Sequence, residues 1–336
     1  MKFEKWYDEN YKKILIIPAI VLALSLICIG VFYFQTGDIV NKDVSLTGGT
    51  TITIQTEVPS QNLEKIILEN IADFEIKTIS DNAGNQMQLM ITVGESDSEF
   101  LKTTLEKFLG YDLTSENSSE ETTSASLSSD FYRQLIIAVI LAFFWMAAVV
   151  FLIFSKGNKM KFWIVVLNIL LGFFLGNFFL TINPIASAII FLTLSTILIR
   201  TYIKKSVPAF AVMLCAFSSI VMTIAVIEIV GMKISTAGIV AFLMLIGYSV
   251  DTDILLTTRL LKRKEGVNAS LLGAFKTGTT MTITSIIAIA TALIAVFSFS
   301  SVLNQVFTIL LIGLTFDLFN TWVTNASKIK WYVETK

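Results

Sequence analysis

The sequence contains no histidine and only two cysteines among its 336 residues. The absence of histidine removes the commonest metal ligand and the usual proton carrier near neutral pH, so any proton chemistry must fall to carboxylates. Cys28 and Cys215 both lie inside apolar runs, which favours inert packing residues over a disulfide or a metal pair. We therefore expect no disulfide framework, no metal site and no bound cofactor.

Charged residues are also scarce, at 15% of the chain, whereas 54% is hydrophobic and the mean hydropathy is +0.73. This apolar share exceeds that of ordinary soluble domains. The apolar residues come in blocks of roughly 18 to 25, a length that crosses about 30 Å of hydrocarbon at about 1.5 Å per residue. Composition and block length together predict a membrane protein.

We predict about eight membrane-spanning helices that form an all-α bundle. Their approximate ranges are 14–34, 132–154, 161–181, 183–200, 207–230, 235–258, 277–299 and 302–326. In the third and fourth spans, Asn183 and Pro184 mark either a tight outer turn or a broken hairpin that never fully crosses. The first span follows basic residues and lacks a small-residue cleavage pattern, which predicts an uncleaved signal anchor.

Lysine and arginine predict the orientation, because positive charge near span ends favours the cytoplasmic side. With eight spans, every basic cluster falls on one side: Lys2 to Lys13, Lys156 to Lys161, Arg200 to Lys205, Arg259 to Lys276, and Lys328 to Lys336. Segment 35–130 has 17 acidic and 5 basic residues, hence a net charge of −12, which leaves +11 for the rest because the whole chain carries −1. We expect both termini in the cytoplasm and segment 35–130 outside the cytoplasmic membrane.

Residues 35–113 show the pattern of a small extracytoplasmic α+β domain. The expected elements are a strand at 50–56, a helix from 59 or 60, strands at 74–80 and 86–93 around a turn at 81–85, and a helix at 97–109. The order strand, helix, strand, strand, helix suggests two layers in a split βαβ, or ferredoxin-like, arrangement.

The next segment, 114–130, is almost entirely Ser, Thr and Glu, which cannot bury enough apolar surface to fold. We therefore expect a linker between the outer domain and the second span. Asn117 begins an Asn-Ser-Ser sequence that matches the acceptor pattern for N-glycosylation, although a pattern this short often arises by chance.

Three aspartates lie within predicted spans, where a charged side chain costs about 2.5 to 3.5 kcal/mol at mid-membrane and therefore usually faces a cavity or a partner. Asp251 and Asp253 lie in the sixth span, roughly 9 to 12 Å inside the cytoplasmic boundary. Being two residues apart, they point about 200° away from each other, so one is expected to face the interior and the other a neighbouring span or subunit. Asp317 lies near mid-depth in the last span, with Asn320 and Thr321 on the same stripe.

Lys276 precedes a hydroxyl-rich stretch, KTGTTMTITS, in the seventh span. A lysine there could pair with a buried aspartate and make that carboxylate part of a proton switch. The alternatives are structural. Lys276 can snorkel to the cytoplasmic surface, Gly247, Gly278 and Gly313 can serve close helix packing, and each aspartate can make an interhelical hydrogen bond alone.

Three blocks in the last three spans resemble the SecF family of protein-export subunits, in its archaeal form. They are GYSVDTDILLTTR from Gly247 to Arg259, KTGTTMTITS from Lys276 to Ser285, and FDLFNTWVTN from Phe316 to Asn325. LTGGT, which contains Gly48 and Gly49, resembles the glycine motif that follows the first span in that family. The resemblance covers most of the chain apart from its middle.

The resemblance implies SecD as a partner, in a pseudo-symmetric unit related to the resistance-nodulation-division transporters. That unit would assist the SecY channel in exporting unfolded polypeptides at the expense of the ion gradient, a non-enzymatic role in contact with membrane lipid and without nucleic acid. By motif match, the ion-coupling residues are Asp251, Asp253, Lys276 and Asp317, supported by Asn320 and Thr321. The further motif positions are Gly48, Gly49, Gly247, Tyr248, Arg259, Trp322 and Asn325.

The chain departs from the family pattern in three places. The family has six spans, so residues 161–203 form an inserted hairpin; Ser219 and Ser45 stand where relatives carry aspartate. The missing carboxylate at Ser219 weakens a proton-wire assignment. The expected division is 1–34 N-terminus and first helix, 35–113 outer domain, 114–130 linker, 131–160 second helix, 161–203 hairpin, 204–327 four further helices and 328–336 cytoplasmic tail.

Two other functions fit parts of the pattern. A self-contained transporter of the same superfamily, for a lipid or small molecule, would normally carry two outer domains and two sets of motifs, and this chain has one of each. An intramembrane aspartyl protease could pair Asp251 with Asp317, but the glycine-flanked aspartate of such proteases is absent.

Overall fold

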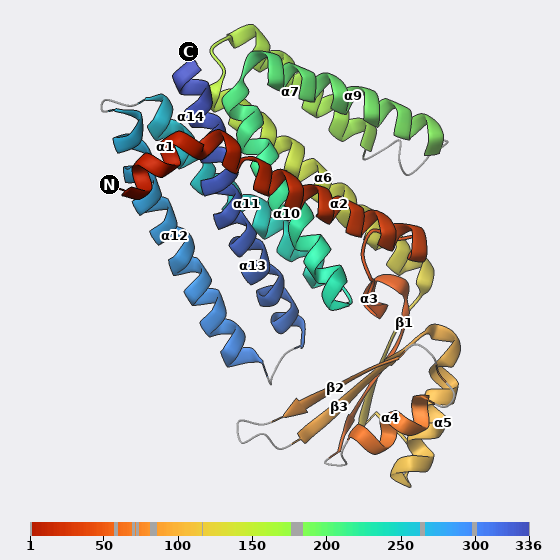
Figure 1. The fold of residues 1–336 in the computed structure, drawn as a ribbon. Helices are drawn as coiled ribbons and strands as arrows, with labels where there is room; N and C mark the ends of the chain where they lie inside the picture. Colours follow the sequence, from red (N-terminus) through yellow and green to blue (C-terminus); the bar gives the residue numbers. More distant parts are fainter. Residues whose placement is uncertain are drawn as a thin grey trace.

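The structure is a computed structural model, and residues 2–56, 60–68, 71, 74–80, 86–115, 117–175, 184–262, 266–297 and 301–335 are described. A bundle of long helices carries a small α+β domain at one end (Figure 1). Both termini lie at the opposite end of the bundle. Because the basic clusters of the sequence belong to that same end, the charge asymmetry of the chain follows the long axis of the molecule.

Six helical stretches in the described part of the chain are long and apolar enough to cross a membrane. They comprise α2 (Ile16–Thr36), α6 (Ala125–Phe154), α10 (Val207–Val230), α11 (Thr236–Leu261), α12 (Val267–Val296) and α13 (Ser301–Phe319). A short amphipathic helix, α1 (Lys2–Ile14), leads into α2, and α13 continues through the π-helical segment η3 (Asn320–Asn325) into α14 (Ala326–Thr335). Six of the predicted spans are thereby confirmed as candidate spans.

The expected hairpin is a pair of helices, α7 (Asn158–Phe173) and α9 (Pro184–Lys205), which run side by side at one edge of the bundle (Figure 1). α7 packs on α6 and α9 packs on α10. α9 also touches α6, where the rings of Phe151 and Tyr202 lie 5.1 Å apart between centroids. Asn183 lies outside the described residues, so a total of eight crossings stays a prediction.

The α+β domain contains β1 (Gly49–Gln55), α4 (Ser60–Leu68), β2 (Phe74–Ser80), β3 (Gln86–Val93), α5 (Ser98–Leu109) and β4 (Ser118–Thr123). The strand order is β2-β3-β1-β4 with every neighbouring pair antiparallel. The unit β1-α4-β2 therefore has β3 between its two strands, and the unit β3-α5-β4 has β1 between its two strands. Strand residues such as Ile52 and Ile91 pack with Leu63 of α4 and Leu101 of α5 in one core. The predicted turn at 81–85 lies outside the described residues.

The prediction that residues 114–130 form an unfolded linker is wrong, because this segment contains β4 and the first turns of α6. An edge strand needs only main-chain hydrogen bonds to one neighbour, and most side chains of β4 remain exposed, so low hydrophobicity does not prevent it. The hydroxyls of Thr50 and Thr122 pair across the ladder at 3.0 Å. α6 then begins at Ala125, capped by the Ser124 hydroxyl, which accepts from the Leu127 N–H.

Gly48 joins the outer domain to the bundle at a point where only glycine fits. Its φ is +87°, in the left-handed region, and a Cβ there would lie 2.5 Å from the backbone nitrogen of Ala125 at the start of α6. Nearby, the Asn41 N–H donates to the Glu228 carboxylate at 3.1 Å, and the Asp43 N–H donates to the Ile234 carbonyl at 2.9 Å. Hydrogen bonds therefore hold the chain that leaves α2 against the end of α10 and the loop between α10 and α11.

Candidate functional site

A group of polar side chains lies in the middle of the bundle, where α10, α11, α13 and η3 meet. We call it the buried polar cluster. Its members are all buried: Ser219, Ser249, Asp253, Thr257, Asp317, Asn320, Thr321, Thr324 and Asn325. Burial of so many polar groups among apolar helices is costly unless they bond to one another, and most of them do.

Asp253 of α11 is fully buried, with 0% of its surface exposed. The Asn325 side-chain amide donates to the Asp253 Oδ1 at 2.8 Å and also lies 3.4 Å from the Thr257 hydroxyl. The Asp253 Oδ2 has no hydrogen-bond partner among the described residues. A hydrogen bond to one oxygen thus orients the Asp253 carboxyl, while the other oxygen can still accept a hydrogen bond.

Asp317 of α13 is placed in the same way, with 1% of its surface exposed. The Ser249 hydroxyl of α11 donates to the Asp317 Oδ1, and within the described chain no group bonds the Oδ2. Asp253 and Asp317 are close enough to interact electrostatically. Two acids on adjacent helices therefore share one low-dielectric site.

Ser219 lies in this cluster, at the position where the family resemblance called for an aspartate. The Asn320 side-chain amide donates to the Ser219 hydroxyl at 3.1 Å, and the Thr324 hydroxyl donates to the Asn320 Oδ1 at 3.2 Å. The position therefore lies in the same buried cluster as the two carboxyls, although its serine carries no charge. The cluster contains two acids where the resemblance implies three.

The π-helical turn of η3 explains how the last span supplies so many members of the cluster. In a regular α-helix, residues 317, 320, 321 and 324 share one face, and residue 325 begins to leave it. The wider i→i+5 turn at Asn320–Asn325 keeps Asn325 buried and directed at Asp253. Single π turns of this kind occur frequently at functional sites.

Several residues singled out from the sequence lie outside the cluster. Asp251 is exposed on the opposite side of α11 from Asp253, as the 200° separation predicts. Lys276 is exposed on α12 and forms no ion pair with any described residue. Arg259 donates from Nη1 to the Gly273 carbonyl at 2.6 Å, which ties α11 to α12. Tyr248 is exposed, so the motif residues divide into a buried set and a surface set.

Close helix packing, the alternative role weighed for the glycines, applies to two of the three. A Cβ at Gly278 would lie 2.8 Å from the Trp322 ring and 3.0 Å from Thr252, and Gly313 is similarly tight against a leucine of α11. Trp322 in turn packs edge-on against Phe275, with centroids 4.9 Å apart. Gly247 has no atom within 4 Å of the Cβ position, so packing does not explain it.

The cluster has the chemistry of a site that exchanges a proton or a small cation. No lysine or arginine pairs with either carboxyl among the described residues, and an uncompensated buried charge is expensive. Each acid therefore needs a bound proton or cation for its charge state to be stable. Among the described residues, no group of three histidine, cysteine, aspartate or glutamate side chains is arranged to hold a metal ion.

A second polar group, at the end of the bundle that carries the termini, escaped the sequence analysis. Lys330 of α14 has only 1% of its side chain exposed and forms an ion pair with Asp8 of α1. Its Nζ also lies 2.9 Å from the Asn268 side chain of α12 and 5.1 to 5.3 Å from the ring centroids of Tyr11 and Tyr7. No local pattern could reveal a pair separated by 322 positions. We call this group the terminal clamp.

Comparison with known proteins gives consistent results over nearly the whole chain. The family profile "Protein export membrane protein SecD/SecF, C-terminal" matches residues 175–335. The protein-export membrane protein SecF of Methanocaldococcus jannaschii is 32% identical, covering 97% of this chain and 96% of the relative. SecF of Pyrococcus furiosus is 30% identical, covering 99% and 94%. SecF of Methanolacinia petrolearia is 45% identical over 143 residues, which is 42% of this chain and 50% of that protein.

The fold agrees with these matches. The crystal structure of SecDF, a translocon-associated membrane protein from Thermus thermophilus, superposes with a TM-score of 0.60 at 14% identity. The match covers 100% of this chain and 39% of the SecDF chain. Six candidate spans among the residues described and two relatives that match over nearly the whole chain lead to one conclusion. This chain is a multi-pass membrane protein that belongs to the SecF family of protein-export membrane proteins.

Proposed function

We propose that this chain is an accessory subunit of the Sec translocase and works with SecD to promote protein export across the cytoplasmic membrane. The 32% identity to a SecF protein over 97% of the chain carries this proposal. We propose a mechanical rather than an enzymatic role, in which Asp253 and Asp317, both buried among the helices of the bundle, do not act on a substrate. The outer α+β domain, whose strand order supports a ferredoxin-like classification, would contact the exported polypeptide near the SecY channel.

A SecD partner is supported by the surface of α11. Val240, Met244, Tyr248 and Asp251 recur every three or four residues and are all exposed, which makes one continuous stripe. A carboxylate in such a stripe is poorly solvated by lipid and favours a protein neighbour. The chain matches 39% of the Thermus SecDF chain, and we propose that another subunit supplies a counterpart to the remainder.

Ion coupling is assigned to the buried polar cluster, with Asp253 and Asp317 as the exchanging groups. Their unbonded oxygens and the absence of a cationic partner in the described chain support a bound proton or monovalent cation. Asn325 orients Asp253 and Ser249 orients Asp317, while Asn320 and Thr321 lie buried in the same cluster. Asp251 and Lys276, which the motif match also implicated, would act at the subunit surface.

Co-purification tests the subunit assignment. A tagged chain solubilised from its native membrane should retain SecD, identified by mass spectrometry. Tyr248→Ala combined with Asp251→Leu should reduce the recovered SecD several-fold, whereas Ile287→Ala, at an exposed position on α12, should not. Recovery of the wild-type chain without SecD would refute the proposed partnership.

A separate experiment tests ion coupling. Asp253→Asn and Asp317→Asn should each abolish the part of export that collapses with the ion gradient, because a neutral amide cannot exchange a proton or cation. Thr282→Val, which changes a buried hydroxyl of α12 with little change of shape, should retain it. Unchanged gradient sensitivity in both aspartate variants would remove the coupling role and leave the export role intact.

A further inference from the structure

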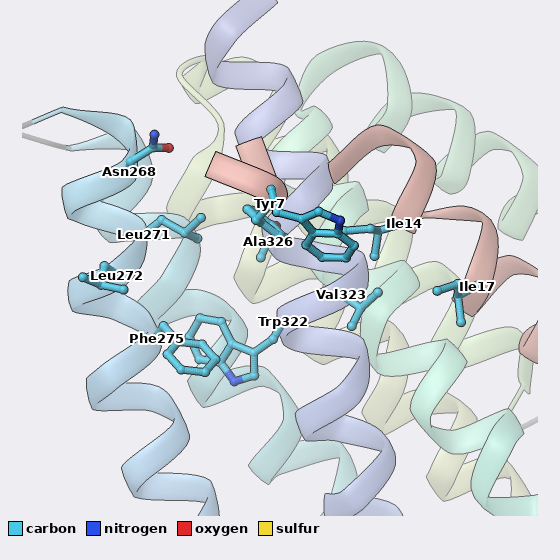
Figure 2. Close-up of a pocket in the computed structure, with 11 residues that line it drawn as sticks. Tyr7, Ile14, Ile17, Asn268, Leu271, Leu272, Phe275, Trp322, Val323 and Ala326 are labelled. Carbon is cyan, nitrogen blue, oxygen red and sulfur yellow. The ribbon is translucent and has the colours of Figure 1, made fainter. Parts of the chain in front are cut away.

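An apolar pocket opens beside the terminal clamp, between α1 and α12. Its volume is about 340 Å³, within the range of about 300 to 1,000 Å³ that small-molecule sites occupy. Leu272 and Phe275 form one wall, Ile14 and Ile17 form the other, and Trp322 lies on the floor (Figure 2). Trp6, Tyr7, Asn268, Leu271, Val323 and Ala326 complete the lining.

The lining selects hydrocarbon rather than a polar ligand. Almost all of its surface belongs to apolar and aromatic side chains. Its polar members Tyr7 and Asn268 are already engaged: the Tyr7 hydroxyl pairs with Ser327 at 3.0 Å, and the Asn268 amide donates to Asp8 at 3.0 Å. An occupant would therefore bury apolar surface and would gain little from hydrogen bonds in the pocket.

The position of the pocket favours the tail of a lipid over a water-soluble apolar molecule. Ile14 and Ile17 begin the first apolar run of the chain, so the pocket lies where the bundle enters the membrane. Trp6 lies next to this boundary, the level at which tryptophan is enriched in membrane proteins. α1 itself has the amphipathic, lysine-containing pattern of helices that lie in the interface plane.

An exposed positive charge next to a lining residue indicates the sign of the headgroup. Lys13 is exposed, follows Trp6 by seven residues on the same helical stripe and directly precedes the lining residue Ile14. Lys13 forms no ion pair with any described residue, whereas Lys12 lies over the rings of Tyr11 and Trp331 at 5.7 and 5.6 Å. A headgroup above the pocket would meet the Lys13 ammonium.

We propose that this pocket binds the hydrocarbon tail of an anionic lipid, with its headgroup beside Lys13, in the leaflet at the end of the bundle that carries the termini. The bound tail fills the space between α1 and α12 and supports the terminal clamp, because Asn268 belongs to both the pocket and the clamp. This site does not depend on the partner or on the ion coupling proposed above.

Brominated lipids test the site because bromine quenches nearby tryptophan fluorescence. A chain that keeps only Trp322 is made by replacing Trp6, Trp145, Trp163 and Trp331 with Phe, and a control chain keeps only Trp145, an exposed residue of α6. Each is reconstituted in phosphatidylcholine vesicles that contain a minor fraction of tail-brominated phosphatidylglycerol or tail-brominated phosphatidylcholine. We expect Trp322 to report a roughly fivefold preference for the anionic lipid, the equivalent of the ~1 kcal/mol that one basic residue gains near an anionic surface. Trp145 should report no preference.

Two pairs of variants separate the pocket from general contact with the bilayer. Lys13→Gln should remove the preference, and Leu272→Phe, which fills the pocket from an exposed wall position, should reduce quenching of Trp322 at least twofold. Ile287→Phe, at an exposed position on the same helix, should leave both unchanged. Equal quenching by the two lipids, insensitive to Leu272→Phe, would show bulk exposure only and overturn the proposal. If the single-tryptophan chain does not fold, native mass spectrometry of the wild-type and Leu272→Phe chains in the mixed lipids decides the same question by the retained phosphatidylglycerol.

Discussion

At the scale of single residues, the hydrogen bond from Asn325 to Asp253 should stabilise the fold, and the two residues should be energetically coupled. Asn325→Ala removes the amide that donates to the Asp253 Oδ1 and should lower the free energy of unfolding by about 1 to 3 kcal/mol, since it leaves a buried acceptor without that partner. Combined with Asp253→Ala, the loss should be less than additive, because both changes break the same contact. Thermal unfolding of the four chains in one detergent measures the coupling, and strict additivity would contradict it.

Gly278 and Gly247 form a matched pair of glycines on neighbouring helices. Gly278→Ala puts a methyl group 2.8 Å from the Trp322 ring and should cost about 1 to 3 kcal/mol of stability through overpacking. Gly247→Ala meets no atom within 4 Å and should be neutral or stabilise α11 by up to ~1 kcal/mol. Melting temperatures of both variants are the measurement. If Gly278→Ala were as stable as Gly247→Ala, the close contact of α12 with η3 would be wrong.

Single residues also show what sequence reasoning could reach. The angular separation of Asp251 and Asp253 follows from helix geometry alone, so their opposite environments could be predicted. The partners of the acids could not. The bond from Ser249 to Asp317 depends on the axial register of α11 against α13, which no spacing within one helix determines. Ser249 lies four residues before Asp253 and so shares its helix face, yet its hydroxyl bonds to the other acid, Asp317.

At the scale of secondary-structure elements, the terminal clamp holds α1 against α14 through Lys330. Asp8→Asn leaves a buried ammonium without its main counter-charge, which should cost about 1 to 3 kcal/mol, less than for a fully buried pair because the Asp8 side chain is 42% exposed. Adding Lys330→Met should restore part of the loss, since the uncompensated charge is then gone. Protease cleavage within α1 and unfolding temperature report the effect. Equal stability of the Asp8→Asn and wild-type chains would mean that Glu334, 3.8 Å from Lys330, suffices.

The elements differ in how well they can be predicted from their own sequences. Long apolar helices were identified to within a few residues at most ends, because lipid imposes a length and a composition. β4 was missed because its stability comes from the main chain of β1, and its own side chains carry no apolar period. The π turn of η3 was also beyond prediction, because its i→i+5 bonding depends on the packing of Asn320–Asn325 around Asp253.

At the scale of the whole molecule, the charge distribution divides the protein into two ends. The acidic outer domain lies at one end of the bundle and both termini lie at the other (Figure 1). The buried polar cluster lies between them within the helices, and Gly48 fixes the outer domain to the start of α6. A change in the packing of α11 against α13 could therefore reach the outer domain through the loop that binds Asn41 and Asp43.

The two-ended arrangement predicts the accessibility of engineered cysteines. Both native cysteines are unpaired and lie in apolar helices, so a background with Cys28→Ala and Cys215→Ser leaves no competing thiol. Ser119→Cys in β4 and Thr335→Cys in α14 then place one exposed thiol at each end of the molecule. Since basic residues favour the cytoplasmic side and the outer domain is acidic, a membrane-impermeant maleimide applied to intact cells should label Ser119→Cys. Thr335→Cys should be labelled only after the membrane is permeabilised. Five candidate spans in the described residues separate the two positions, and an odd number of crossings puts them on opposite sides of the membrane. Labelling of both thiols in intact cells would therefore contradict this topology. Labelling of Thr335→Cys alone in intact cells would invert the protein and put the acidic domain in the cytoplasm.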